Sequence, residues 1–283
     1  MLPSMTPGLP STGMSSGDGA ASYDVQAFEA DLTALAADDW TAGDGPWSVA
    51  TTGDLDSVTI AAYNDGNATT LGPDGSNGVV IDPSGAQQQN GTVDNAPGFS
   101  WTPSTVTAAQ TSFAVGAYVQ VESAPDNPKN SSLVLSLVAS AGANPTAAQL
   151  RWQDDDSAYL RQLGAGGTDD LGNSAIGGHP RRLALVRVGG GVYAYYSTST
   201  GAVSASDWAT MVGGSAPSGW AQVTGTYGPY MAIQNTPNAD TRLYDASPTN
   251  ADPFAVLVST NQATGVNFVL ERFGGCFYKA VIS

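Results

Sequence analysis

Short runs in which apolar and polar residues alternate fill most of the chain, and they predict β-strands. The clearest run covers residues 112–122, where an apolar residue stands at every second position from Phe113 to Val121. A period of two places those side chains on one face of a strand, so we expect one face of this strand to be buried. Arg182–Val188 and the run at 192–197 flank three consecutive glycines, which is typical of a β-hairpin.

The same pattern extends over the rest of the sequence and predicts an all-β protein. Turn sequences rich in Asp, Asn and Gly recur between the apolar runs, as at residues 64–67 and 74–78. Further strands are predicted at Ser57–Tyr63, 79–81, 99–101, 133–138, 149–152, 158–162, 230–234, 254–259, 267–271 and 277–282. So many short strands and turns indicate an antiparallel jelly-roll β-sandwich that occupies residues 39–283 as one domain.

Residues 1–38 differ from the rest and are predicted to anchor the protein. Residues 1–22 consist mainly of Pro, Gly, Ser, Thr and Met, and we expect them to form an extended arm. An apolar stripe of helical spacing runs through residues 24–38 and predicts the one helix of the chain. The stripe consists of Val25, Phe28, Leu32 and Leu35. Two roles stay open: the helix closes one end of the sandwich, or it attaches the protein to a partner together with the arm.

The charge of the chain excludes several classes of partner. Its 283 residues carry 9 Lys and Arg against 25 Asp and Glu, which gives a formal net charge of −16. A protein with so few basic residues has no basic face for phosphates, so we expect no nucleic-acid partner. No apolar stretch is long enough to span a bilayer, and the leading residues lack the basic and apolar regions of a secretory signal. With one cysteine, the chain forms no internal disulfide.

Aromatic residues gather in the second strand of the predicted hairpin and in the segment that follows it. On a strand, Tyr193 and Tyr195 face one side and Tyr196 faces the other. One set of rings therefore packs in the core, while the other set offers flat faces to a sugar or a partner chain. The candidate glycan-binding residues are Arg182, Tyr193, Tyr195, Trp208, Trp220 and Tyr230. Burial in the core or in a subunit interface is the alternative role of the same residues.

Candidate catalytic residues are few. His179 is the single histidine and no G-x-S-x-G sequence is present, so a Ser-His-Asp arrangement has no support. His179, Arg181 and Arg182 belong either to a turn that leads into the hairpin or to a small cationic spot for an anion. Cys276 is interpreted as a small buried residue.

The densest acidic run is Asp154-Asp155-Asp156. It lacks the D-x-[DN]-x-[DN]-G spacing of a dedicated calcium loop, and consecutive carboxylates on an extended chain point in different directions. We interpret the run as a solvated turn, with a calcium ion as the alternative. No other cofactor is expected.

Residues 181–208, RRLALVRVGGGVYAYYSTSTGAVSASDW, resemble the central hairpin of concanavalin A-like (laminin G-like) jelly rolls. In that family an arginine-bearing strand turns through glycines into an aromatic strand. Asp38-Asp39-Trp40 with Trp47 is similar to the family's opening strand, and residues 274–282 are similar to its closing strand. The resemblance implies the same sandwich over residues 38–283, but family members include glucanases, lectins, adhesion domains and phage appendage proteins, so the fold does not choose among them.

The glucanases of this family carry an E-x-D-x-x-E motif on one strand, and this sequence has none. We therefore expect a non-enzymatic structural protein of a tailed-phage virion, either a capsid decoration or a tail-appendage subunit. It would bind other virion proteins through residues 1–38, form a homo-oligomer and be displayed on the particle surface, where it could adhere to host glycans. A secreted or cell-surface lectin-like module is the alternative, and a glycoside hydrolase is the third hypothesis.

Overall fold

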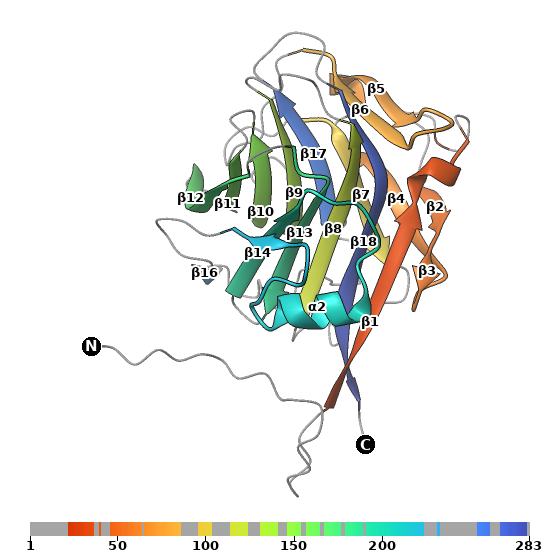
Figure 1. Ribbon diagram of the computed structural model, residues 1–283. Helices are drawn as coiled ribbons and strands as arrows, with labels where there is room; N and C mark the ends of the chain where they lie inside the picture. Colours follow the sequence, from red (N-terminus) through yellow and green to blue (C-terminus); the bar gives the residue numbers. More distant parts are fainter. Residues whose placement is uncertain are drawn as a thin grey trace, which may run out of the picture.

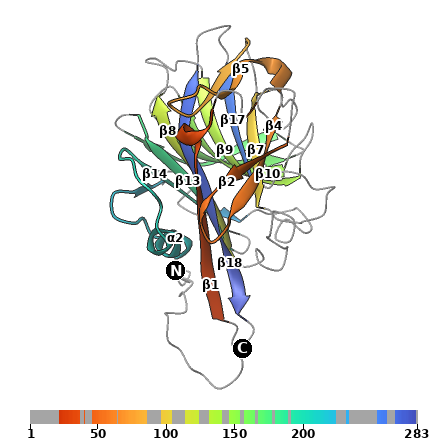
Figure 2. The same cartoon turned by 90° about the vertical axis from the view of Figure 1, so that its right-hand side faces the viewer.

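The computed structural model describes residues 22–36, 40, 46–63, 65–85, 96–103, 114–123, 131–140, 146–153, 157–164, 167–176, 179–188, 191–223, 231–232, 254–260 and 267–281. Within these residues, two antiparallel β-sheets face each other, as seen in Figure 1 and edge-on in Figure 2. The predicted all-β sandwich is therefore confirmed. No helix of the described part is long and apolar enough to cross a membrane.

Sheet A has ten strands, and its centre combines strands from both ends of the chain. Its main order is β15 (Ala221–Gln222), β14 (Gly191–Ser197), β13 (Arg182–Val188), β8 (Ala114–Ser123), β18 (Phe268–Val281), β1 (Ser22–Asp31) and β3 (Thr52–Gly53). Strand β16 (Met231–Ala232) pairs with β14, and the hairpin of β5 (Ala68–Pro73) and β6 (Val79–Pro83) joins through β18.

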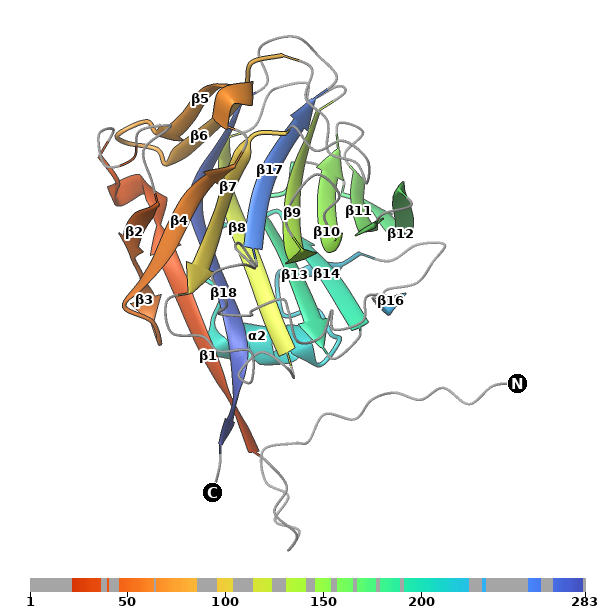
Figure 3. The same ribbon diagram turned by 180° about the vertical axis from the view of Figure 1, so that it is seen from behind.

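Sheet B has eight strands and is turned toward the reader in Figure 3. Its order is β12 (Gly167–Ala175), β11 (Ser157–Gly164), β10 (Thr146–Gln153), β9 (Ser131–Ser140), β17 (Phe254–Thr260), β7 (Gly98–Pro103), β4 (Ser57–Tyr63) and β2 (Trp47–Ala50). The described helices are short: η1 (Leu32–Ala34), η2 (Asp65–Asn67) and α2 (Ala205–Val212).

The main core lies between the sheets, where each strand contributes every second side chain. Leu133, Leu135 and Leu137 of β9 are fully buried there, opposite Val119 of β8. Aromatic rings fill the space toward β7, where the ring centroids of Trp101 and Phe273 are 4.6 Å apart. Close packing of this kind gives most of the favourable free energy of folding.

The prediction of a helix over residues 24–38 is wrong. Residues 22–31 form β1, which pairs with β18 along its whole length, from Ser22 opposite Val281 to Asp31 opposite Arg272. Only η1 follows, and Asp31 caps it by accepting a hydrogen bond from the backbone N–H of Thr33 at 3.0 Å. The pairing with β18, some 240 residues away in the sequence, outweighs the helical spacing of the apolar residues. Periodicity within the segment does not reveal such a tertiary contact.

The four residues of the predicted anchoring stripe consequently separate. On a strand, positions 25 and 28 lie on opposite faces, so Phe28 enters the main core while Val25 packs on the outer face of sheet A. Leu32 is fully buried, and Leu35 is half-buried against the main core. Phe28 and Leu32 therefore stabilise the sandwich and are not exposed to a partner.

The expectation of one buried face for residues 112–122 is also wrong, because both faces of β8 are buried. Val119 and Val121 face the main core, and Tyr118 faces a second hydrophobic core on the outer side of sheet A. This second core consists of Tyr118, Ala184, Val186, Tyr195, Val203, Trp208, Met211, Val212, Trp220 and Cys276. Helix α2 supplies three of these side chains and lies across the sheet, as Figure 1 shows.

Two glycines lie where neighbouring elements of sheet A and its cover approach each other closely. At Gly116 of β8, an added Cβ would lie 2.5 Å from Cζ3 of Trp208 and 3.0 Å from Sγ of Cys276. At Gly274 of β18, an added Cβ would collide with the backbone oxygen of Phe28. The glycines at 274–275 thus allow one continuous strand, where the sequence predicted two separate ones.

We expect Gly116→Ala to lower the free energy of unfolding by about 1–3 kcal/mol, because the buried Trp208 ring has no room to move away. Urea denaturation followed by far-UV circular dichroism measures this change. Gly66→Ala is the matched control, since nothing lies within 4 Å of an added Cβ there, and it should leave the stability unchanged. Equal stability of both variants would contradict the proposed packing of α2.

Candidate functional site

The aromatic residues predicted to bind a glycan do come together, but as part of the second core. Tyr195 and Trp208 are fully buried, and Trp220 is 8% exposed. Tyr193 is half-buried and packs over Gly214, while Tyr230 lies outside the described residues. A ring with no exposed face cannot stack on a sugar, so the glycan-binding role is wrong for Tyr195 and Trp208, and their burial is the alternative role predicted from the sequence.

Arg182 is also a structural residue and not a ligand contact. Its guanidinium donates hydrogen bonds to the backbone oxygen of Gly201 at 3.0 Å and to Oγ of Ser197 at 3.1 Å. Its Cζ lies 4.4 Å from the centroid of the Trp220 ring, in a cation–π contact. Arg182 is 6% exposed, and this burial lowers the pKa of its guanidinium. Through its contacts with Ser197, Gly201 and Trp220, the side chain holds the 198–220 segment onto sheet A.

The remaining candidates have separate structural positions. The His179 ring meets the edge of Trp152 at a centroid distance of 5.3 Å, and Arg181 lies 3.8 Å from a carboxylate oxygen of Glu271. Cys276 is buried as predicted, and its burial raises the pKa of the thiol, so the thiol stays protonated. His179 and Arg181 thus have partners of their own in the segment that leads into β13.

The calcium prediction stays untested. Asp154, Asp155 and Asp156 lie outside the described residues. Among the side chains that the structure places, no three His, Cys, Asp or Glu residues are close enough to hold a metal ion.

A different polar surface is formed by the outer face of sheet B. In β9, Ser132 and Ser136 alternate with the buried leucines and therefore lie on this outer face. In β10, Gln149 and Arg151 alternate with core residues in the same way. Tyr159 continues the surface on β11. We call this set, with Ser100 of β7, the polar face.

Hydrogen bonds between neighbouring strands order the polar face. The amide of Gln149 donates from Nε2 to Oγ of Ser136 at 2.9 Å, and Nε of Arg151 donates to Oγ of Ser132 at 2.7 Å. The serines and Gln149 are at most 1% exposed, whereas Arg151 and Tyr159 are half-buried. The serines and Gln149 are therefore closed to solvent, and Arg151 and Tyr159 are the members of the polar face that a ligand can reach.

The strand register aligns small residues across the centre of sheet B. Ala61 of β4 lies opposite Ser100 of β7, and Ser100 lies opposite Ala255 of β17. Ala255 is in turn opposite Ser136 of β9, which is opposite Gln149. Four adjacent strands therefore carry only Ala or Ser at this level, where larger β-formers usually stand. The row ends at Gln149.

Sheet B is almost free of acidic residues. Within the described bounds of its strands, Asp169 and Asp170 of the edge strand β12 are the only Asp or Glu residues. Consecutive residues of a strand point to opposite faces, so the strands supply at most one carboxylate to the outer face. A glycosidase of the common kind needs two carboxylates on either side of the scissile bond. The strands of sheet B do not provide such a pair.

Comparisons with known proteins find structures of similar fold but identify no family. No protein-family model matches the chain, and no curated protein matches it. A solved carbohydrate-binding module, described as the CBM2 module of the Lactobacillus casei BL23 phage J-1 evolved Dit, is 10% identical, with a TM-score of 0.40. The match covers 91% of this chain and 100% of that one.

Two further solved structures show similar likenesses. A functionally unknown protein from Saccharomyces cerevisiae is 11% identical, with a TM-score of 0.38, over 79% of this chain and 97% of that one. The alginate lyase AlgAT5 of Polysaccharide Lyase family 7 is 11% identical, with a TM-score of 0.29, over 91% and 94% of the two chains. At these values the likenesses assign neither a family nor a function, so the concanavalin A-like similarity stays a resemblance.

The residues of the polar face were not among the sequence-based candidates, although the sequence contains their signal. In SSLVLSLVAS and QLRWQ, polar residues alternate with Leu and Trp. The alternation alone predicts a polar outer face, but it does not reveal which strands are neighbours. The aromatic cluster gives the stronger signal in the sequence, but its rings are buried because α2 covers that face of sheet A.

We expect Tyr195→Phe to lower the free energy of unfolding by about 1–2 kcal/mol. The buried Tyr195 hydroxyl donates to the backbone oxygen of Met211 at 2.7 Å, and its removal leaves that oxygen without this donor. Tyr196→Phe is the matched control on the same strand, because its hydroxyl makes a longer contact of 3.3 Å in an exposed place. Thermal and urea unfolding measure both variants, and a larger loss for Tyr196→Phe would contradict this assignment.

Proposed function

We propose that this protein is a non-enzymatic structural protein of a tailed-phage virion that adheres to glycans through the polar face of sheet B. The polar face is the observation that carries the glycan-binding part. Arg151 and Tyr159 are half-buried there, above a layer of serine and glutamine side chains that is closed to solvent. Sugars present rows of hydroxyl groups, which such side chains bind by hydrogen bonds.

The near absence of acidic residues from sheet B supports binding without hydrolysis. General acid and base groups for glycoside cleavage are carboxylates, and the described strands of sheet B carry them only on β12. The guanidinium of Arg151 and the hydroxyl of Tyr159 would hold a ligand in place without moving protons at a glycosidic bond. The carboxylates of Glu29 and Asp31 lie on sheet A, where both pair with Arg272.

The virion part of the proposal has its support in the sequence. Residues 1–21 precede the first described strand and are rich in Pro, Gly, Ser and Met, with one charged residue, Asp18. A segment of that composition gains stability only by contact with another molecule. With β1 assigned to the sandwich, the proposed anchor is limited to residues 1–21. Many copies on one particle would turn weak glycan contacts into strong adhesion.

Binding to a printed array of neutral and acidic bacterial glycans tests the adhesive part. We expect the wild-type protein to bind at least one glycan, and Arg151→Ala to weaken that binding about 10-fold or more, as expected for the loss of a hydrogen bond from a charged group. Titration calorimetry with the glycan identified on the array measures the ratio of dissociation constants.

Arg181→Ala serves as the matched control for Arg151→Ala. Arg181 lies beside sheet A, and its guanidinium is partly exposed next to Glu271. The control should keep wild-type affinity, and both variants should unfold at similar urea concentrations. An array without any bound glycan, or equal affinities of the two variants, would overturn the adhesive role.

Deletion of residues 1–21 tests the anchoring part. Ser22 is the first residue of β1, so the shortened chain keeps every described strand and should unfold at the same temperature as the full chain. We expect it to be absent from purified particles, whereas the full chain is incorporated. Particle proteins are compared by quantitative mass spectrometry. Unchanged incorporation of the shortened chain excludes the anchor, and a free lectin-like module then explains a glycan-binding result better.

A further inference from the structure

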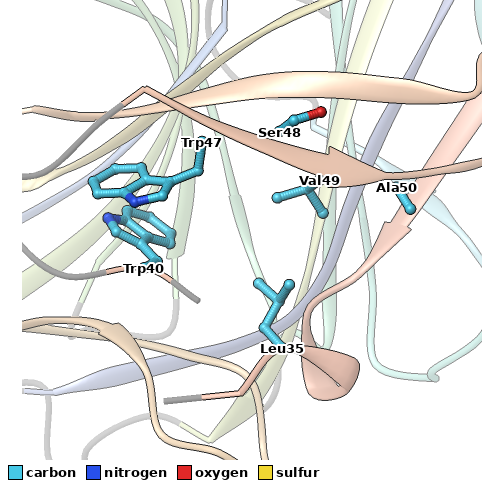
Figure 4. Close-up of a pocket in the computed structure, with 6 residues that line it drawn as sticks. All are labelled: Leu35, Trp40, Trp47, Ser48, Val49 and Ala50. Atoms are coloured by element: carbon cyan, nitrogen blue, oxygen red, sulfur yellow. The ribbon is translucent and has the colours of Figure 1, made fainter. Parts of the chain in front are cut away.

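A second candidate site lies at the edge where the two sheets meet near β2. It is a pocket of about 230 Å³ lined by Leu35, Trp40, Trp47, Ser48, Val49 and Ala50. Figure 4 shows Trp47 lying over Trp40, with Leu35 and Val49 pointing toward the same space. Ser48 and Ala50 are exposed, and Trp47 is half-buried, so solvent reaches the pocket. We call it the edge pocket.

The two indole rings of the edge pocket are held in place by packing. The ring centroids of Trp40 and Trp47 are 4.8 Å apart, and the Trp40 ring meets Phe99 of the main core edge-on at 5.4 Å. Trp40 is 3% exposed, so it is a fixed base on which Trp47 rests. A ring that is already fixed loses little conformational freedom when a ligand stacks on it.

The lining selects a neutral ligand of small size. None of the six lining residues is charged, and their polar side-chain groups are the hydroxyl of Ser48 and the two indole N–H groups. The volume is below the range for drug-sized ligands, so one ring fits and a longer chain must leave the pocket. A negative ligand would also be repelled by a protein of net charge −16.

The edge strand itself is poorly suited to bind another peptide strand. β2 has four residues and follows Pro46, and two residues after Ala50 the chain is already in β3 of sheet A. Short edge strands and nearby prolines prevent strand addition. Its outer backbone groups remain next to the pocket, where they can exchange hydrogen bonds with hydroxyl groups.

We propose that the edge pocket binds one neutral pyranose ring, stacked on Trp47. The C–H groups on the flat side of a pyranose pack on an indole face, and its hydroxyls reach the backbone of β2. This inference rests on the proposed glycan adhesion and adds a second contact point to it. Trp47 thus takes the stacking role that the sequence analysis proposed for Tyr193 and Tyr195.

Titration of the ¹⁵N-labelled full chain with methyl glucoside, methyl galactoside and N-acetylglucosamine tests the edge pocket. The six tryptophans give six indole N–H signals, and single substitutions assign those of Trp40 and Trp47. We expect at least one sugar to shift these two signals in a saturating way, while the signals of Trp101, Trp152, Trp208 and Trp220 stay in place. Glucuronate should cause at least 10-fold weaker shifts.

A variant that removes the stacking ring and keeps an apolar side chain tests the pocket with little change to the fold. Trp47→Leu removes the flat indole face but keeps an apolar side chain over Trp40, and we expect it to weaken sugar binding 10-fold or more, as read from the Trp40 signal. Tyr193→Leu makes the matched change at a half-buried ring of the second core and should bind like the wild type. Absence of a saturating shift with all three sugars, or equal binding by the two variants, overturns the inference.

The two glycan proposals fail in distinguishable ways. Arg151→Ala should leave the Trp47 shifts unchanged, because Arg151 lies on β10 and not in the edge pocket. Array binding that depends on Arg151, combined with unmoved tryptophan signals, overturns the edge pocket and keeps the polar face. Shifts of Trp47 with no dependence of array binding on Arg151 support the edge pocket and overturn the polar face.

Discussion

The pairing of β1 with β18 is the constraint on which the rest of the structure depends. Ten consecutive residue pairs join the start and the end of the described chain. Arg272 of β18 strengthens the contact through an ion pair of 2.6 Å with Glu29. The Tyr118 hydroxyl of β8 also donates to Glu29, and burial together with this carboxylate raises the pKa of Tyr118. Three strands from distant parts of the sequence are thereby fixed in register.

That register decides which side chains face inward. It sends Phe28 and Phe273 into the main core and leaves Cys276 and Tyr118 on the outer face, where Trp208 covers them. Sheet A is thus buried on both sides, so its aromatic residues contribute to stability. β1 also leads into η1, which brings Leu35 to the edge pocket opposite β2.

The two sheets also differ in the charged groups that they carry. Ion pairs and hydrogen-bonded carboxylates gather on sheet A, as with Glu29, Asp31 and Glu271. The described strands of sheet B carry uncharged polar groups and arginine at their centre. The central serines and Gln149 are closed to solvent, so the proposed glycan contact rests on the half-buried Arg151 and Tyr159.

The sequence by itself determined the fold class and most strands. Apolar runs bounded by turn sequences identified β4, β9 and β13, because a run of β-forming residues between two turns is a local property of the chain. It also indicated that Tyr193 and Tyr195 share a face, as they do.

Tertiary structure alone decided the rest. Residues 22–31 form a strand because they pair with β18 over their whole length. The aromatic residues of β14 and of the segment after it are buried because α2 covers them. The row from Ala61 through Ser136 to Gln149 exists only once strands separated by tens of residues are adjacent. Such long-range pairing depends on the free energy of the whole sheet, which no single segment of the sequence encodes.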